Sequence, residues 1–519
     1  MDHFSIILNK VKGIHFISQQ QQRIGLLTIA TFISACALYN QVFKRPASKD
    51  NCPMVPYTDT WKGSSMDYLQ DPRAFVEKWT EKLGHVYRVH MFGQMHTIAS
   101  GKYAREILMS DDFDFGVGTQ KKFDIFSMAG IFDNNLTGAI IRNAIVKHLN
   151  PHLKEFTPHV VENFTIGFHE ILGDVTEPVE LSHLMPLIQR MVTRGSATVF
   201  IGKTLCKNKN VTSIMQNITT DIGKMHPRYH QSWLMAFPWM LRLYFKLYGR
   251  LSQDIKRQRK IMLDALVPEI DKRQADAQND PNWQRPTDVL QELIEDSALS
   301  SGKHGDIYTA VLNQLLILIF ASIHTTSENT SITLYRLLQN PSVIDELLQE
   351  QEQVLRKAGY DPKSGKNSCE VFTFDIIKNM PRLDSVCRES LRLRSQFFEL
   401  AHTNIRDHKV TLSNGVIIPS DGDVLINTWH NHHQGGDDIG EFNPFRYVDT
   451  GYPATKVGDN YLVFGEGRHA CPGRWLAVQE IKTIVSMLIH DYKFHAPEGV
   501  VFPPKGSGLP YGKVIIERK

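Results

Sequence analysis

The sequence predicts a mainly α-helical protein with small β-sheets, preceded by an N-terminal transmembrane helix. Three observations support this prediction. Residues 24–43 form an almost continuous apolar run, which is long enough to cross a bilayer as a helix. Between about residues 100 and 400, apolar residues recur mostly at the three-to-four spacing of helices. Few segments have the pattern of strands, and these are short, so only small sheets are expected.

The apolar run is followed at once by Lys44 and Arg45, which by the positive-inside rule favour a cytosolic position for the rest of the chain. A cleaved signal peptide is the alternative, but the run begins late, is long and has no clear small-x-small site before Lys44. Pro46, Pro53 and Pro56 then predict a stiff, non-helical spacer. We therefore expect four parts: a lead at 1–23, an anchor at 24–43, a linker at 44–60 and one globular domain at 61–519.

Several elements of this domain follow from local signals. A helix is expected to begin after Asn340 and to end near Gly359, because apolar residues between them keep helical spacing. Asn414 and Gly415 predict the turn of a hairpin. Polar residues over about 272–288 predict a surface loop. Short strands are expected at 85–91, 97–99 and 424–428.

Composition and charge exclude several classes of function. The net charge of +3 in 519 residues is too small to indicate a nucleic-acid-binding protein. The six cysteines form no C-x-x-C pair and no small disulfide framework, which favours a reducing compartment. We interpret His430, His432 and His433 as part of a surface loop, since no helical i, i+4 pair and no acid completes a metal site.

The stretch from Phe464 to Gly473 carries the strongest chemical signal. It places Cys471 in a tight, glycine-bounded turn, beside Arg468 and just before an apolar helical pattern. A thiolate is a strong ligand for a haem iron, and the start of a helix lowers the pKa of a thiol. Glycines such as Gly465 let the backbone approach a flat porphyrin, and Arg468 is placed to pair with a haem propionate.

This stretch resembles Phe-x-x-Gly-x-Arg-x-Cys-x-Gly, the haem-binding signature of the cytochrome P450 family, with Arg468 taken as the arginine of the signature. A buried structural cysteine is the alternative for a lone residue. The resemblance implies the mainly α prism-shaped fold of that family and haem b as cofactor. Cys471 is then the axial ligand of the iron, and the remaining cofactor-binding residues are Phe464, Gly465, Arg468 and Gly473.

The segment Ala321-Ser-Ile-His-Thr-Thr326 follows a continuous apolar run and resembles the distal helix of the same family, Ala/Gly-Gly-x-Asp/Glu-Thr-Thr/Ser. Its hydroxyls are expected to bond back to carbonyls and to open the helix locally. The resemblance gives Thr325 the role of steering protons. His324 stands where an acid is usual, and a histidine relays protons near neutral pH. Glu328, one turn further on, is the possible substitute.

Three more elements complete the resemblance. Glu389 and Arg392 follow the structural Glu-x-x-Arg pattern, and Arg446 stands in a Phe-x-Pro-x-Arg-aromatic element. The family then implies a buried Glu389–Arg392–Arg446 triad that supports the haem and takes no part in catalysis. A second partner for a haem propionate is expected at Arg142 or Lys147.

The implied activity is a monooxygenase reaction, in which one oxygen atom of dioxygen enters a substrate C–H bond and the other is reduced to water. The chain has no flavin or nicotinamide fingerprint, so electrons come from outside. An anchored, single-pass chain facing the cytosol implies NADPH–cytochrome P450 reductase in the same endoplasmic reticulum membrane, with cytochrome b5 as a second donor. The expected substrate pocket consists of Phe320, Ala321, Ile323, Phe397, Phe398, Leu400 and Leu509.

Such an apolar pocket suits a lipophilic small molecule, and Glu399 is placed to orient a hydroxyl. The distal and cysteine motifs resemble fungal members that oxidise steroids or terpenoids, which makes a steroid or terpenoid hydroxylase the leading hypothesis. Two alternatives stay open: a haem-thiolate isomerase or dehydratase that needs no reductase, and a non-catalytic membrane haem-binding protein. Residues 225–248, with interleaved aromatic and basic side chains, form either a core helix or a second membrane contact.

Overall fold

A computed structural model describes residues 52–133, 138–218, 236–361, 368–394, 396–436, 438–503 and 508–519. The expected lead and anchor lie outside the described residues, as do residues 44–51 of the expected linker. The described chain from Cys52 onward forms one compact unit.

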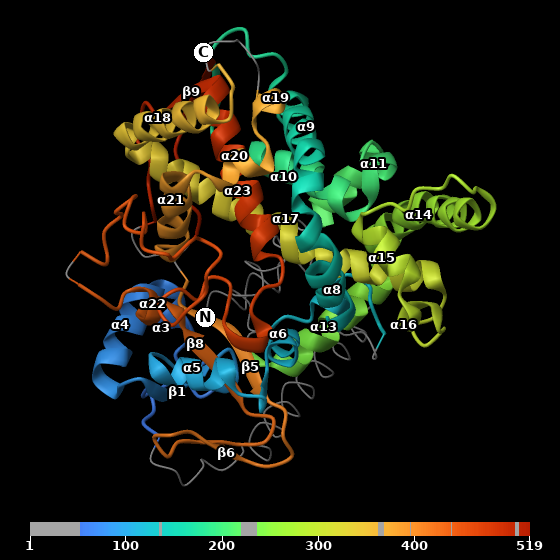
Figure 1. The fold of residues 1–519 in the computed structure, drawn as a ribbon. Helices are drawn as coiled ribbons and strands as arrows, with labels where there is room; N and C mark the ends of the chain where they lie inside the picture. Colours follow the sequence, from blue (N-terminus) through green and yellow to red (C-terminus); the bar gives the residue numbers. More distant parts are fainter. Residues whose placement is uncertain are drawn as a thin grey trace, which may run out of the picture. The chain divides into compact units, whose positions relative to one another are not determined.

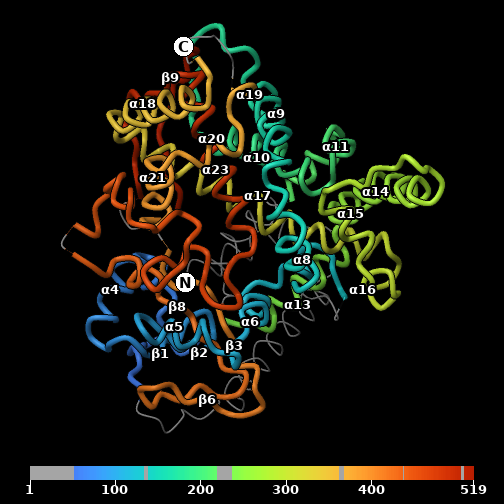
Figure 2. The backbone as a smooth tube through the Cα atoms, viewed as in Figure 1, coloured from blue at the N-terminus to red at the C-terminus, as the bar shows by residue number. Residues whose placement is uncertain are grey.

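Three small sheets lie within this unit. The largest has the strand order β1-β2-β8-β5-β3, and β2 and β8 are its parallel pair, in register at Thr97 and Val424. These strands lie together at the lower left of Figure 2. The expected short strands are confirmed, and so is the hairpin with Asn414 and Gly415 in its turn. The strands are β1 (Val86–Met91), β2 (Gln94–Ala99), β3 (Phe113–Asp114), β4 (Val179–Leu181), β5 (Phe398–Asn404), β6 (Val410–Thr411), β7 (Ile417–Ile418), β8 (Asp423–Asn427), β9 (Tyr492–His495) and β10 (Val514–Arg518).

Four long helices form the centre of the main core: α9 (Leu153–Leu172), α10 (Met185–Phe200), α17 (Ile307–Gln339) and α23 (Arg474–Asp491). Figure 1 shows them side by side, above the largest sheet. Helix α10 is buried along almost its whole length, because the other three helices surround it. Its buried arginines, Arg190 and Arg194, both pair with the Glu170 carboxylate of α9.

The remaining helices are shorter or lie at the periphery. Their bounds are α3 (Ser65–Gln70), α4 (Pro72–Leu83), α5 (Lys102–Met109), α6 (Phe115–Lys122), α7 (Ile125–Met128), α8 (Ala139–Ala144), η1 (Ile145–Leu149), η2 (Asn150–His152), α11 (Gly202–Leu205), α13 (Pro238–Leu251), α14 (Gln253–Asn279), α15 (Val289–Glu295), α16 (Ser297–Ser300), α18 (Pro341–Lys357), α19 (Ser368–Val371), α20 (Phe374–Lys378), α21 (Pro381–Arg392), α22 (Thr428–His432) and η4 (Gly467–His469).

Helix α17 is long and apolar enough to cross a membrane by length and composition alone. Its contacts with α10, α14, α21 and α23 identify it instead as a core helix. The hydroxyls of Ser322 and Thr325 donate to backbone carbonyls one turn back, over 2.8 Å each. The predicted local opening is wrong, however, because α17 stays α-helical throughout and keeps its own hydrogen bonds.

Two other predictions are corrected. The expected loop over 272–288 begins only after Asn279, since α14 continues to that residue. Arg273 stabilises this extension by pairing with Glu269 and Asp288. The three histidines expected on a surface loop lie on α22 or directly after it, and His432 is fully buried.

Glu480 is a buried acid on α23 whose ionisation affects stability. It is almost fully buried, and Ser196 on α10 donates a hydrogen bond to its Oε1 over 2.9 Å. Burial raises the pKa of this carboxyl from its usual 4.5 to about 8. The unfolded carboxyl loses its proton above about pH 4.5, whereas the folded one holds it, so stability falls as pH rises from about 4.5 to 8.

The Glu480→Gln variant is therefore expected to be more stable than the wild type at pH 8, by on the order of a few kcal/mol. At pH 5 the two proteins are expected to differ by less than about 1 kcal/mol. Urea unfolding followed by circular dichroism at both pH values measures this difference. Equal stabilities at pH 8 would show that the Glu480 carboxyl is already ionised in the folded protein.

Candidate active site

Cys471 lies in the turn between η4 and α23, three residues before the first residue of that helix. Its backbone N–H donates to the carbonyl of Phe464 over 2.7 Å, which closes the loop on itself. The guanidinium of Arg474 donates to the Cys471 carbonyl over 2.7 Å and to Thr455 over 3.0 Å. The ring of Phe464 is buried against Tyr461 beneath this loop. The hydrogen bonds at its N–H and at its carbonyl thus fix the backbone of Cys471, which carries the thiol.

The electrostatics of the thiol differ from the sequence-based expectation. Burial raises the pKa of Cys471, and the N–H groups of Gly473 and Arg474 together with the Arg474 guanidinium only partly offset this. The expected lowering by the helix start is present but smaller than the desolvation. Such a thiol is deprotonated when a metal binds it, because the ion carries the larger local charge. The site therefore suits a thiol that ionises upon metal coordination.

Two glycines shape the loop. Gly465 and Gly467 have φ values of +64° and +67°, which other residues rarely adopt. A Cβ on Gly467 would lie 2.4 Å from the carbonyl oxygen of Leu108. The close approach that requires glycine at position 467 is therefore to the end of α5. A Cβ on Gly473 would lie 4.0 Å from the Cys471 sulfur.

Arg468 does not hold the position expected from the signature. The signature places its arginine two residues before the cysteine, and His469 occupies that position in this chain. The Arg468 guanidinium instead donates to the Phe113 carbonyl over 2.8 Å and lies 3.3 Å from the Asp111 carboxylate. Arg468 therefore ties the cysteine loop to β3, and His469 takes the position of the signature arginine.

A second histidine, which no pattern in the sequence indicated, lies beside His469. The rings of His402 and His469 lie 5.8 Å apart, and His402 Nδ1 donates to the Leu400 carbonyl over 2.6 Å. Burial lowers the pKa of His402 to about 4 and also lowers that of His469, so both rings are neutral. Both Nε2 atoms are buried and make no hydrogen bond within the described part of the chain, although that of His469 lies 3.6 Å from the Asp114 carboxylate.

This donor set fits a cofactor that carries carboxylates. A carboxylate placed against the two Nε2 atoms would draw protons onto them, because an opposite charge nearby favours the charged form of histidine. Arg142 lies at the same loop and donates to the Ala470 carbonyl over 3.3 Å. Lys147, the other candidate, is an exposed residue of η1. Of the two candidates, the structure places Arg142 beside the cysteine loop.

Helix α17 has one open face. Along this helix, a stripe at i, i+3, i+4, i+7, i+8 and i+11 spacing is exposed or half-exposed: Ile317, Phe320, Ala321, His324, Thr325 and Glu328. The expected catalytic residues His324 and Thr325 both lie on this stripe, with Phe320 and Ala321. Ile323 points to the opposite side and is fully buried in the main core, which removes it from the expected pocket.

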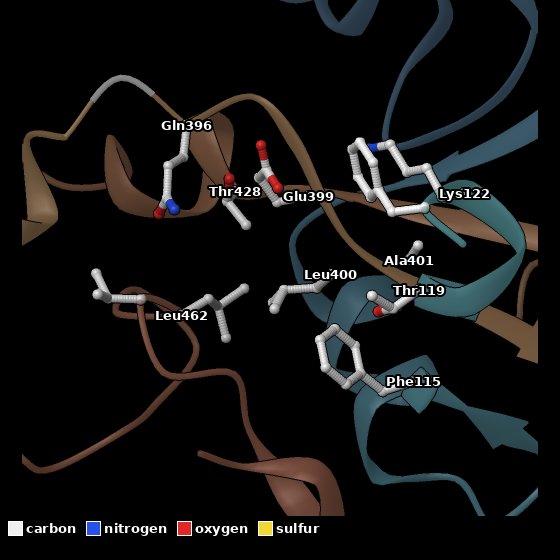
Figure 3. A pocket seen from close by; sticks show the side chains of 11 residues that line it. Phe115, Thr119, Lys122, Gln396, Glu399, Leu400, Ala401, Thr428 and Leu462 are labelled. Carbon is white, nitrogen blue, oxygen red and sulfur yellow. The ribbon is translucent and has the colours of Figure 1, made fainter. Parts of the chain in front are cut away.

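The other expected pocket residues lie in different parts of the structure: at a cavity, in a core cluster and in a loop. Leu400 lines a cavity of about 140 Å³ between α6, β5 and the segment before Phe464, shown in Figure 3. Phe397 packs against Trp429, and Phe398 stacks on Tyr68, so both belong to a second core cluster. Leu509 is a half-buried loop residue. Phe115, Thr119 and Leu462 line the cavity and were not expected from the sequence.

The predicted triad is present. Two nitrogens of Arg392 lie 2.7 and 2.8 Å from the Glu389 carboxylate, and Arg446 Nε lies 3.0 Å from Glu389 Oε1. Arg392 also donates to the carbonyl of His432 over 2.7 Å. The Nε2 of His432 accepts from the backbone N–H of Leu462 over 2.8 Å. His432 thereby connects the triad to the chain that leads into the cysteine loop.

A family model for cytochrome P450 matches residues 55–516, which is most of the chain. The chain belongs to the cytochrome P450 family. Relatives of this P450 include monooxygenase hepE of Aspergillus oryzae, which is 27% identical over 74% of this chain and 67% of its own length. Monooxygenase olcJ of Penicillium canescens is 28% identical over 70% and 67%, and monooxygenase 151 of Postia placenta is 24% identical over 91% and 93%.

The P450 is accordingly an oxidoreductase of the monooxygenase type, and the family implies a haem-thiolate cofactor. This cofactor has an iron and two carboxylates. Cys471, in its hydrogen-bonded loop, offers a thiol for the iron, and His402, His469 and Arg142 offer nitrogen atoms for a carboxylate. Bound there, the haem would supply the oxygen chemistry, and Cys471 would hold its iron.

Proposed function

We propose that this P450 is a steroid or terpenoid hydroxylase that uses haem b and is anchored in the endoplasmic reticulum membrane. The observation that carries the proposal is the position of Thr325 on the one open face of α17, next to His324. A hydroxylase needs protons on this side, whereas an isomerase or a haem-binding protein without catalysis does not. The fungal relatives agree with the reaction class and leave the substrate open.

The cavity in Figure 3 supports a lipophilic substrate that carries a polar group. Leu400, Leu462 and Phe115 lie along one side of it, while Gln396, Thr428 and Glu399 lie along the other. The Thr428 hydroxyl already donates to the Phe397 carbonyl over 3.1 Å, so Gln396 and Glu399 are the side chains best placed to orient a ligand. The cavity, at about 140 Å³, is smaller than the roughly 300–1,000 Å³ of ordinary ligand pockets and has no lining residue on α17, so it would hold only part of such a molecule.

The membrane location finds support in α13. Its exposed residues form two adjacent columns along the helix, an apolar one of Leu243, Leu247 and Leu251 and a basic one of Arg242, Lys246 and Arg250. Such a face suits the boundary between acyl chains and anionic headgroups. We further propose a cytosolic orientation, with electrons from NADPH–cytochrome P450 reductase and cytochrome b5 as a second donor, because a P450 monooxygenase needs an external redox partner.

Reconstitution tests the proposal. The full chain in lipid vesicles, with the reductase and NADPH, is incubated with a panel of steroids and terpenoids, and products are identified by mass spectrometry. At least one member of the panel is expected to gain a hydroxyl group. NADPH consumption without oxidation of any panel member would reject the substrate class, and absence of substrate-stimulated NADPH consumption would reject the hydroxylase reaction.

Removing the imidazole of His324 is expected to uncouple this reaction. In His324→Ala the product formed per NADPH should fall by about tenfold or more, with hydrogen peroxide rising in its place, since positioned acid–base groups contribute at least this much. His408→Ala is the matched control, because His408 is an exposed loop residue paired only with its neighbour Asp407. Unchanged coupling in His324→Ala would remove His324 from proton delivery.

A further inference from the structure

Helix α17 carries an ion network that reaches the chain between α21 and β5. His324 Nε2 lies 3.0 Å from Glu328 Oε1, one helical turn away. The second oxygen of that carboxylate, Oε2, lies 2.5 Å from the Arg394 guanidinium. Arg394 also donates to Asn329 Oδ1 over 3.1 Å, so it holds two successive residues of α17. A single carboxylate thus bridges an imidazole and a guanidinium.

The three side chains of this network differ in how much of each is exposed to solvent. The side chain of His324 is 39% exposed on the open face of α17, whereas those of Glu328 and Arg394 are 16% and 20% exposed. Burial acts to raise the pKa of Glu328, but the hydrogen bond from His324 and the charge of Arg394 hold it below its usual value. Glu328 is therefore an ionised carboxylate at neutral pH, fixed behind the histidine.

This arrangement determines which nitrogen of His324 takes up a proton. In the neutral ring, Nε2 keeps its hydrogen to donate to Glu328, so the lone pair lies on Nδ1. A carboxylate behind the far nitrogen of an imidazole selects its tautomer and stabilises the imidazolium that forms. Arg394 prevents the Glu328 carboxylate from rotating away, because it occupies the second oxygen and is itself held by Asn329.

We propose that Glu328 and Arg394 are positioning residues that fix His324 as the Nε2–H tautomer, so that Nδ1 is the atom that takes and releases protons beside Thr325. A hydronium ion on the open face gives a proton to Nδ1, so that an O–H bond breaks as the N–H bond forms; the Nδ1–H bond then breaks as the proton passes to a water beside Thr325, while Glu328 stays ionised. This inference rests on the proposed function, because the monooxygenase reaction is the one that consumes protons on this face.

The tautomer is measured directly by nuclear magnetic resonance. The haem-loaded full chain is labelled with ¹⁵N-histidine and studied in the reduced, carbon monoxide-bound state, and the His324 signals are identified by their loss in His324→Ala. The wild type is expected to show the Nε2–H form. In Glu328→Gln and in Arg394→Gln, the share of the Nδ1–H form is expected to rise by about threefold or more.

Turnover gives the second readout. Glu328→Gln and Arg394→Gln are expected to raise peroxide release per NADPH by about tenfold, and Arg394→Lys to restore part of the coupling because it keeps the positive charge. Glu352→Gln is the matched control, since it removes a glutamate from an exposed i, i+4 pair with Arg356 on α18. It should leave coupling and the His324 signals unchanged.

The outcomes distinguish a failure of the positioning roles from a failure of the proposed function. If the thiolate-type carbon monoxide spectrum forms and the panel substrate is oxidised, but neither variant changes the His324 tautomer, the positioning roles are wrong and the proposed function stands. The network then only fastens α17 to the chain before β5. If the wild type forms no thiolate-type spectrum or oxidises no substrate, the proposed function fails, and this inference fails with it.

Discussion

Cys471→Ala is expected to lose the red-shifted band that a reduced haem-thiolate protein gives with carbon monoxide. Oxygenation should fall by more than about 100-fold, the size of loss that changes in the outer shell of metal sites already produce. The reason lies in the loop, where the Cys471 N–H donates to the Phe464 carbonyl and the Arg474 guanidinium donates to the Cys471 carbonyl, which fixes the backbone that carries the thiol. Difference spectroscopy on the reduced protein measures the band.

Cys387→Ala is the matched control for this result. Cys387 is fully buried on α21, and burial raises the pKa of its thiol, so it has the environment of an inert core cysteine. Its removal is expected to cost about 1 kcal/mol of stability and to leave the band in place. A band that persists in Cys471→Ala would mean that another residue holds the iron.

Glu389→Gln is expected to destabilise the fold more than any surface change. The carboxylate is fully buried and accepts hydrogen bonds from Arg392, Arg446 and the backbone N–H of Asn443. Its neutralisation leaves the buried Arg392 without its charge partner, and breaking a buried pair in this way costs about 3–5 kcal/mol. Urea unfolding and the rate of haem loss both measure this cost.

Asp438→Asn provides the comparison. Asp438 pairs with Arg446 over 3.1 Å, but its side chain is 57% exposed, so this member of the same network should contribute less than about 1 kcal/mol. Arg446→Gln is a milder test of the triad, because it leaves the Glu389–Arg392 pair intact. Equal losses in Glu389→Gln and Asp438→Asn would contradict the central place of Glu389 in this network.

Local patterns were sufficient where the structure depends on neighbours in sequence. The apolar spacing after Asn340 predicted α18, and Asn414-Gly415 predicted a hairpin turn. The Glu389–Arg392 pair also depends on neighbours, since its two residues share one helix face. Arg446 lies 57 residues after Glu389, so the complete triad came from the resemblance to the family and not from the spacing. The tight turn that holds Cys471 is formed by consecutive residues and was predicted from them.

The failures came from partners distant in the sequence. His432 was expected on a surface loop, but Arg392 and Leu462 bury it, and no local pattern records those contacts. The role of His402 depends on β5 bringing it to His469. Arg394 lies two residues after the end of α21, where no local pattern predicts a contact with Glu328. Only the fold brings its guanidinium to that carboxylate. The Arg468 prediction failed on spacing alone, because His469 stands two residues before the cysteine.

The order of strands in the largest sheet has a consequence for biosynthesis. Strand β2 finds its parallel partner β8 roughly 320 residues later in the chain, which takes about 15 to 65 s at ordinary rates of translation. During that time one edge of the β1–β2 ribbon has no neighbour, and unpaired edges invite pairing with other chains. Nascent chains of this protein are therefore expected to depend on chaperones until residues 423–427 leave the ribosome.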